Sequence, residues 1–147
     1  RDVTLEGENG ILVYGSEENR IQDLRFNNLR FTFLKSELNT IAGGNIDLRG
    51  AMGEKQLFES DISAFYAQYV DDLSIENAKI TWDEVEQDYF RHGLHITQFT
   101  DLKLADVVTT SSPTNPDLLP VIVENGKQFE TDLTPELYRT HQVEGSK

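Results

Sequence analysis

A short phrase of residues recurs along this chain, and it limits the possible folds more than any other feature. The phrase opens with Asp, continues with apolar residues at alternate positions, passes a tight turn and ends in a second alternating run. It spans residues 23–33, 72–82 and 101–110, with a fourth start at Asp2. Alternation at period two is typical of strands with one buried face. Because the phrase repeats, the sequence predicts stacked copies of one strand–turn–strand unit.

Two positions of the phrase are suited to turns. Between the two apolar runs, successive copies carry Asn28, Asn77 and Asp106. Asn and Asp adopt the left-handed backbone conformation of tight turns more readily than most residues do. We expect these three residues to form a ladder of turns. A second turn ladder is expected at the acidic residues that open the copies, Asp2, Asp23, Asp72 and Asp101.

The apolar positions of the copies fall in register. Leu24, Leu73 and Leu102 occupy the same place in three copies, so we expect them to stack inside a coiled ribbon. The fold predicted is an all-β parallel β-helix of about three to four coils. An antiparallel sandwich also uses short alternating strands, but it gives no reason for a phrase to recur in register.

The coils are expected to occupy residues 1–112, with an inserted loop at 50–62. All four prolines follow the last copy of the phrase, at positions 113, 116, 120 and 135. Proline cannot donate to a strand ladder, so this change of composition predicts a Pro-containing C-terminal cap and tail over residues 113–147. Residues 121–123 are the expected last strand, and residues 141–147 the expected loose tail.

Composition excludes several classes of protein. A net charge of −13 and the lack of a basic run make nucleic acid an unsuitable partner. The chain has no cysteine, so it has neither disulfides nor thiolate metal sites. No apolar run approaches the roughly 20 residues of a membrane-spanning helix. The chain starts at Arg1 rather than Met, which we interpret as the start of a mature or truncated product.

Three phrases resemble a known group of proteins. They are residues 64–72, residues 73–77 and Gly43-Gly44-Asn45-Ile46-Asp47-Leu48-Arg49. Over about residues 21–110 the chain resembles the later coils of pectin-lyase-like right-handed β-helix proteins, most closely the polygalacturonase-like, glycoside hydrolase family 28-related proteins of Bacteroidota. The resemblance implies a right-handed helix and a secreted, periplasmic or cell-surface protein that acts on acidic, uronate-containing polysaccharide.

The chain departs from the catalytic pattern of that family. Glycoside hydrolysis needs two carboxyl groups, roughly 6.5–9.5 Å apart for inversion or about 5 Å apart for retention. Asp71-Asp72 resembles the family's Asp-Asp phrase, but Asp72 also fits the turn register, where it would bond nearby backbone amides. His92-Gly93 follows Arg91 rather than Gly, and no Arg-x-Lys phrase follows. The simpler interpretation of His92 is a surface residue where a strand starts.

Side chains on the outer face of the predicted strands are candidates for binding. Residues 64–70 and 93–99 align as strands, with Phe65, Ala67, Leu94 and Ile96 facing inward. The substrate-binding candidates on the outer face are Asp47, Arg49, Tyr66, Gln68 and His95. The tyrosine ring would stack on a sugar ring, and the arginine would hold a uronate carboxylate. The simpler alternative for the Asp47 and Arg49 pair is a local surface ion pair.

Metal and cofactor sites are not expected. His92-x-x-His95 places its two histidines on opposite faces of a strand, which argues against zinc. The acidic clusters lack the Asp-x-Asn-x-Asp-Gly phrase of a calcium loop, so a solvated acidic face is the simpler interpretation.

Two functions remain open at this point. In the first, the chain supplies the C-terminal coils of a polygalacturonase-like glycoside hydrolase whose catalytic carboxylates lie in other coils. In the second, it is a non-catalytic β-helix module that binds glycan, acts as an adhesin or serves as a structural stack. In either case an open N-terminal end would expose strand edges, so we expect it to pack against upstream coils or to self-associate.

Overall fold

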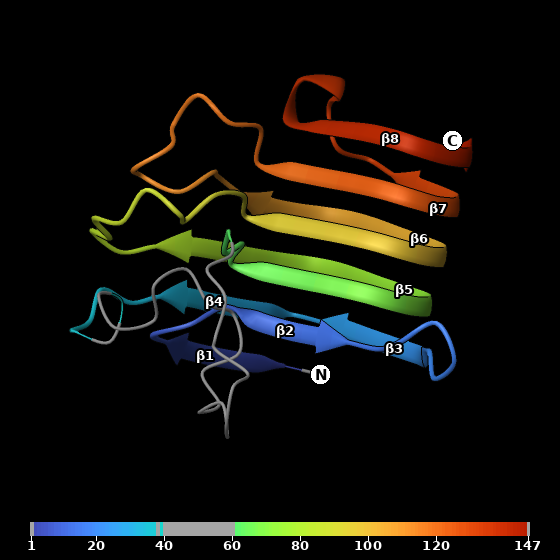
Figure 1. Cartoon of the computed structure of the whole chain (residues 1–147), viewed down its shortest axis with the longest axis horizontal. Helices are drawn as coiled ribbons and strands as arrows, with labels where there is room; N and C mark the ends of the chain where they lie inside the picture. Colours follow the sequence, from blue (N-terminus) through green and yellow to red (C-terminus); the bar gives the residue numbers. More distant parts are fainter. Residues whose placement is uncertain (1, 38, 40–60, 147) are drawn as a thin grey trace, which may run out of the picture.

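The computed structural model describes residues 2–37, 39 and 61–146, and it is all-β (Figure 1). Its regular elements are β1 (Val3–Gly7), β2 (Ile11–Tyr14), β3 (Ile21–Asn27), β4 (Leu29–Phe33), β5 (Phe65–Trp82), β6 (Leu94–Thr109), β7 (Val121–Thr131), a 3₁₀ helix (Pro135–Leu137) and β8 (Tyr138–Ser146). Every strand pairing is parallel. The all-β prediction is confirmed, and the parallel pairing is consistent with a β-solenoid.

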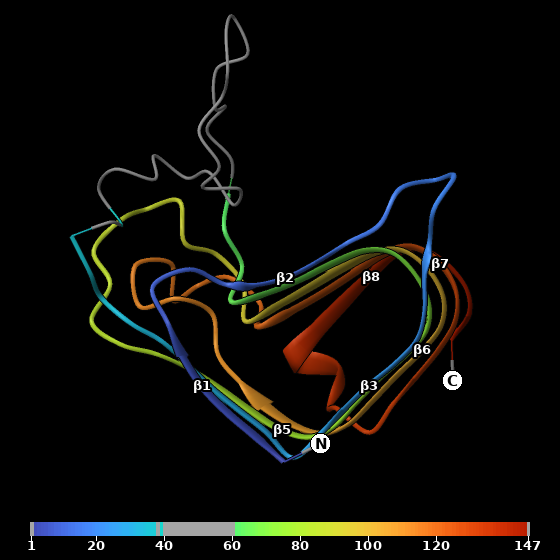
Figure 2. The same ribbon diagram turned by 90° about the horizontal axis from the view of Figure 1, so that it is seen from below.

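The strands stack in register as the repeated phrase predicts. Leu24 pairs with Leu73, and Leu73 pairs with Leu102. Viewed along the stack, successive strands follow one another around a common ring with three sides (Figure 2). We call these sides the first, second and third face. The first face comprises β2 with residues 65–68, 94–97, 121–124 and 138–141; the second comprises β3 with residues 70–76, 99–105, 126–131 and 143–146; the third comprises β1 and β4 with residues 78–82 and 107–109.

Left-handed residues mark the bends of the chain, both at corners between faces and within the second face. The expected ladder of Asn28, Asn77 and Asp106 is confirmed, with φ between 49° and 56°. Asp23, Asp72 and Asp101 form the second ladder, also at positive φ. The placement of Asp2 in that second ladder was wrong. Because Val3 pairs with Leu29, Asp2 stacks beneath Asn28 and belongs to the first ladder.

Another ladder, at the corner between the first and second faces, consists mostly of residue types that do not indicate a turn. It is formed by Tyr69, Gln98, Asn125 and Gln142, with φ between 51° and 55°. Tyr and Gln seldom adopt positive φ, so Asn125 is the one member of this ladder that its residue type indicates.

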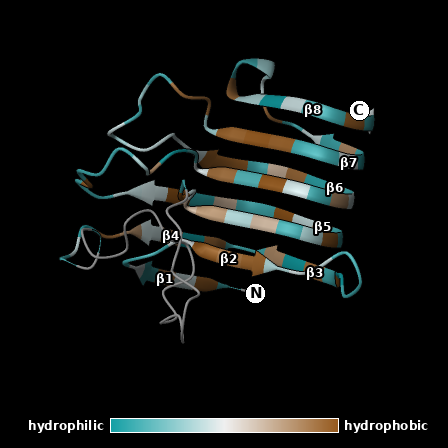
Figure 3. Ribbon diagram, in the orientation of Figure 1, coloured by the Kyte–Doolittle hydropathy of each residue, from teal (hydrophilic) through white to brown (hydrophobic). Residues whose placement is uncertain are grey.

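The core is formed by the inward side chains of the three faces. The leucine stack is flanked by buried Phe65, Ile75 and Leu104. Aromatic rings fill the corner between the third and first faces, where Phe33 stacks on Trp82 at 4.9 Å between ring centroids and contacts Phe90 at 4.8 Å. Apolar positions alternate with polar ones along the ribbons (Figure 3). The stack therefore buries one continuous apolar interior.

The stacking continues beyond the expected boundary at residue 112. β7 pairs with β6, and β8 pairs with β7. Residues 121–123 are therefore not the last strand, and the expected loose tail from His141 is wrong, because residues up to Ser146 lie in β8. Three of the prolines lie in the loop before β7 and the fourth starts the 3₁₀ helix. The division of the chain at residue 112 stays a prediction.

The loops project mainly from one corner of the ring (Figure 2). The loop after β5 buries Val85 and Phe90, so it contributes to the core. The predicted insertion at 50–62 and the strand expected at 45–49 lie outside the described residues, apart from Asp61 and Ile62, the second of which is buried and forms an isolated parallel bridge with Phe90. Among the described residues, no helix is long and apolar enough to cross a membrane.

Candidate functional site

The outer surface of the first face carries the candidate site. Alternation in β5 and β6 turns Phe65, Ala67, Leu94 and Ile96 into the core, as expected, and all four are fully buried. Strand register then aligns the opposite positions across the face. We call the resulting set the outer strip: Leu12, Tyr14, Tyr66, Gln68, His95, Glu124 and Arg139.

The centre of the outer strip is a connected group of side chains. The Tyr66 hydroxyl donates a hydrogen bond to Oε1 of Gln68 at 2.7 Å. The Tyr66 and His95 rings meet edge to face, with centroids 5.2 Å apart. His95 Nε2 lies 3.3 Å from Oε2 of Glu124 on the next strand. The parallel register holds Tyr66 directly beside His95, as the alignment of the two strands predicts.

The local environment shifts the pKa values of two groups here. Burial raises the pKa of Tyr66, and the nearby Tyr14 and Glu124 add to the effect. Tyr66 is therefore a neutral hydrogen-bond donor at ordinary pH. Beside the strip, burial lowers the pKa of His92, although its contact with the Leu119 carbonyl opposes the shift. The His92 and His95 rings lie 6.1 Å apart, so His92 borders the strip.

The ends of the outer strip differ in character. Near the N-terminal end, Tyr14 is 62% exposed and Leu12 is 38% exposed. At the other end Arg139 is exposed and aligns with His95 through Ile122. Sequence reasoning missed Glu124 and Arg139. The available signal was the alternation in residues 121–124 and 138–141, which resembles that of residues 94–97. These segments follow one another at shorter intervals along the chain than the earlier copies do.

The structure places the predicted site residues unequally. Tyr66, Gln68 and His95 lie together on the outer strip. Asp47 and Arg49 lie outside the described residues. Thr97, two residues after His95 on the same side of β6, is only 9% exposed, and its hydroxyl accepts a weak hydrogen bond from Asn125.

The Asp71-Asp72 pair is divided between two arginines. Arg20 Nε lies 2.8 and 3.0 Å from the two carboxylate oxygens of Asp71. Arg25 Nη2 lies 2.6 Å from Asp72 Oδ2 and, by donating this hydrogen bond, lowers the pKa of that carboxyl group. Asp72 is thus a turn residue, as the repeat indicates, but its carboxylate bonds an arginine side chain rather than backbone amides.

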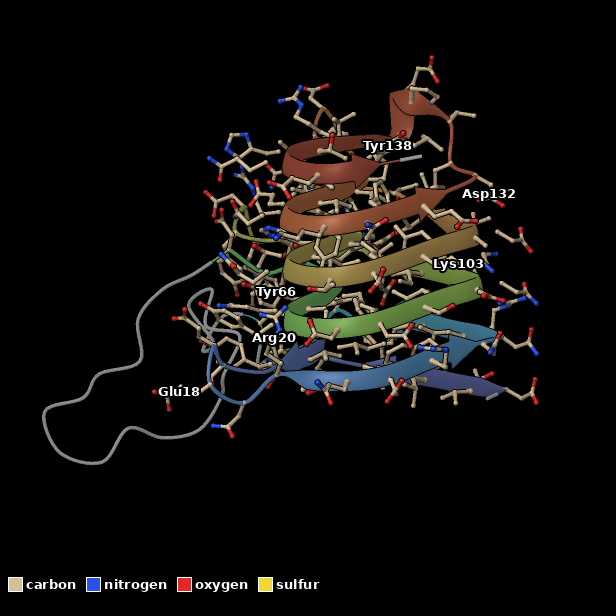
Figure 4. All side chains as sticks on the ribbon, turned by 90° about the vertical axis from the view of Figure 1, so that its right-hand side faces the viewer. Glu18, Arg20, Tyr66, Lys103, Asp132 and Tyr138 are labelled. Atoms are coloured by element: carbon tan, nitrogen blue, oxygen red, sulfur yellow. The ribbon has the colours of Figure 1, made fainter. Side chains whose placement is uncertain are left out.

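The second face carries charges that are paired in a similar way. Lys103 Nζ lies 2.9 Å from Glu76 Oε1, and this hydrogen bond lowers the pKa of Glu76. In Figure 4, Tyr66 and Arg20 lie on one flank of the stack, and Lys103 and Asp132 lie toward the other. The first face, with its exposed aromatic side chains, is therefore the better candidate for contact with a ligand.

Metal binding receives no structural support in the part of the chain that the structure describes. Within it, no group of three or more His, Asp or Glu side chains is arranged to hold an ion. On the outer strip, His95 contacts one carboxylate, that of Glu124.

Comparison of the chain with protein-family models, with curated proteins and with solved structures found no match. The resemblance to pectin-lyase-like proteins consequently remains a hypothesis based on the three phrases at residues 43–49, 64–72 and 73–77.

Proposed function

We propose that the outer strip binds a polysaccharide, whose sugar rings stack on Tyr66 and Tyr14. The observation that carries the proposal is the group of Tyr66, Gln68 and His95 on one rigid sheet, beside the exposed ring of Tyr14. Aromatic rings offer large apolar surfaces with little conformational freedom to lose, while the amide, imidazole and hydroxyl groups can bond sugar hydroxyls. Side chains held by sheet register are already positioned for binding, which reduces its entropic cost.

The polysaccharide class proposed is acidic and uronate-containing. Arg139 is exposed at the C-terminal end of the strip, where a guanidinium group can hold a carboxylate through two parallel hydrogen bonds. The overall charge of −13 opposes this affinity at long range, so we expect binding to strengthen at moderate salt, where repulsion is screened. Arg49, the arginine that the sequence suggested for this role, lies outside the described residues.

The family assignment belongs to the same proposal. We infer that the chain represents coils of a right-handed β-helix protein related to polygalacturonase-like hydrolases, at a secreted, periplasmic or cell-surface location. Hydrolysis needs two carboxyl groups, and on the outer strip Glu124 is the one carboxylate, already in contact with His95. Among the described residues, no second carboxylate lies on the outer strip beside it. Binding without catalysis is therefore the function that the geometry supports best.

Isothermal titration calorimetry with an oligogalacturonide tests the binding proposal. Tyr14→Ala removes an exposed ring with little effect on packing, and Tyr66→Ala removes the central ring. Each should weaken binding about fivefold, since each removes a stacking contact of the order of 1 kcal/mol. Lys79→Ala, on the third face, is the matched control and should leave binding unchanged. Equal affinity for all four proteins, or no binding by the parent chain, would refute the proposal.

A reducing-sugar assay on polygalacturonate separates the two functions. The binding module predicts no release by this chain. Release above the blank, abolished by Glu124→Gln, would instead establish a hydrolase.

A further inference from the structure

The N-terminal end of the stack is open in the part of the chain that the structure describes. On the second face no described strand lies beneath β3, and its inward residues Leu24 and Phe26 are partly exposed, whereas Leu73 and Ile75 one level above are 1% and 0% exposed. On the third face, inward-facing Leu5 is 43% exposed. β2 and β3 each pair with β5 on one side only. This end therefore exposes apolar side chains together with free strand edges (Figure 1).

The C-terminal end exposes a second set of free edges. β8 pairs only with β7, and it spans the same two faces as β2 and β3. Its inward Val143 and Tyr138 are partly exposed, and inward Thr140 is exposed. The 3₁₀ helix and the start of β8 lie across part of the ring at this end (Figure 2), where Tyr138 packs against Phe129 at 5.6 Å between ring centroids.

The two ends are matched in charge as well as in span. β2 contains no charged residue, β3 contains Asp23 and Arg25, and β8 contains Arg139 and Glu144. These three strands are therefore neutral in a chain whose net charge is −13, and β1, the other strand at the N-terminal end, carries one charged residue, Glu6. They also contain neither proline nor lysine, the residues with which proteins commonly protect strand edges from pairing.

We propose that copies of this chain associate head to tail, with β8 of one copy pairing in parallel with β2 and β3 of the next. Continuing the observed register places Tyr138 of one copy next to Ile11 of the other, and Val143 next to Ile21, so the apolar columns run on without a break. On the third face no described strand lies at the level of β8, so the β1 of the second copy, one level below its own β2 and β3, would not overlap with a strand there. An interface of this heterologous kind does not close on itself, so it adds copies in a row.

Two variants, each blocking one end, test the proposal in the full chain. Thr140→Glu places a carboxylate on the exposed inner side of β8, and Leu24→Glu places one at the N-terminal end. Sedimentation velocity of the parent chain should show a sedimentation coefficient that rises with protein concentration. Each variant alone should remain monomeric, while an equimolar mixture should form dimers and nothing larger, because each variant retains one intact end.

Other outcomes overturn the proposal. A parent chain that stays monomeric up to several hundred micromolar would refute self-association. Association of Thr140→Glu alone would show that two N-terminal ends meet instead. If Leu24→Glu does not fold by circular dichroism, Leu12→Pro replaces it. The amides of Ile11 and Gly15 donate toward β5, so by alternation the Leu12 amide faces the free edge. The association test does not depend on the glycan proposal.

Discussion

Gly126 and Phe99 are adjacent on neighbouring strands, and a methyl group at position 126 would lie 2.2 Å from Cε1 of the Phe99 ring. Gly126 follows Phe99 in the inward column of the second face. The glycine leaves the space that the ring occupies.

Gly126→Ala should therefore destabilise the fold through overpacking, by about 1–3 kcal/mol. Urea denaturation measures the change. Combining it with Phe99→Leu, which shortens the opposing side chain, should cost less than the sum of the two single changes. Additive effects would show that the two residues are not coupled.

Asn77 combines a left-handed backbone with a side-chain ladder. Its φ is 49°. Its side-chain nitrogen Nδ2 donates a hydrogen bond to Asn28 Oδ1, and its Oδ1 accepts one from Arg30 Nη2 at 3.0 Å. Asn77→Ala should lower the free energy of unfolding by about 1–2 kcal/mol for the backbone conformation, with an additional loss from the hydrogen bonds. Asn77→Gly removes only the hydrogen bonds, so thermal unfolding should rank it between Ala and the parent. A glycine variant as unstable as the alanine variant would contradict this account.

Arg20 links three levels of the stack at one corner. Besides Asp71, it donates from Nη2 to the carbonyl oxygen of Gln98 at 2.7 Å. Arg20→Lys keeps the charge but loses this geometry, and should destabilise the chain by about 1–2 kcal/mol in chemical denaturation. Arg25→Lys is the control, since its ion pair with Asp72 is about half exposed and should contribute less to stability. Equal losses would contradict the prediction.

His92 makes stability depend on pH. Its Nδ1 lies 2.7 Å from the Leu119 carbonyl oxygen, to which it must donate, and burial lowers its pKa below the ordinary 6.5. Between the folded and unfolded pKa values the unfolded chain binds more protons, so stability falls as pH decreases from about 6.5 and levels off below the folded pKa. His92→Gln should reduce the difference between urea midpoints at about pH 7.5 and pH 5. An unchanged difference would show that other groups are responsible.

Much of the stack could be predicted from local patterns. Apolar alternation in residues 72–82 indicates strands, and Asn or Asp in two of the ladders indicates turns. Strands and turns of this kind could be predicted because each depends on neighbouring residues alone. The same alternation placed Tyr66 beside His95, since both precede the repeated phrase by the same distance. The copy that starts at Asp2 was misplaced because an Asp residue by itself is compatible with either of these two ladders.

Only the tertiary structure decided the remaining features. Tyr69 adopts φ of 53° at a corner where its ring lies 5.6 Å from the Arg20 guanidinium carbon, a contact made through the fold. Glu124 reaches His95, and Arg139 joins the same strip, because loops of different length bring their strands into one register. Residue types by themselves therefore determined where apolar and polar positions alternate in strands and where two of the turn ladders lie. Which side chains become neighbours across the strands depended on how the whole chain closes around its shared apolar interior.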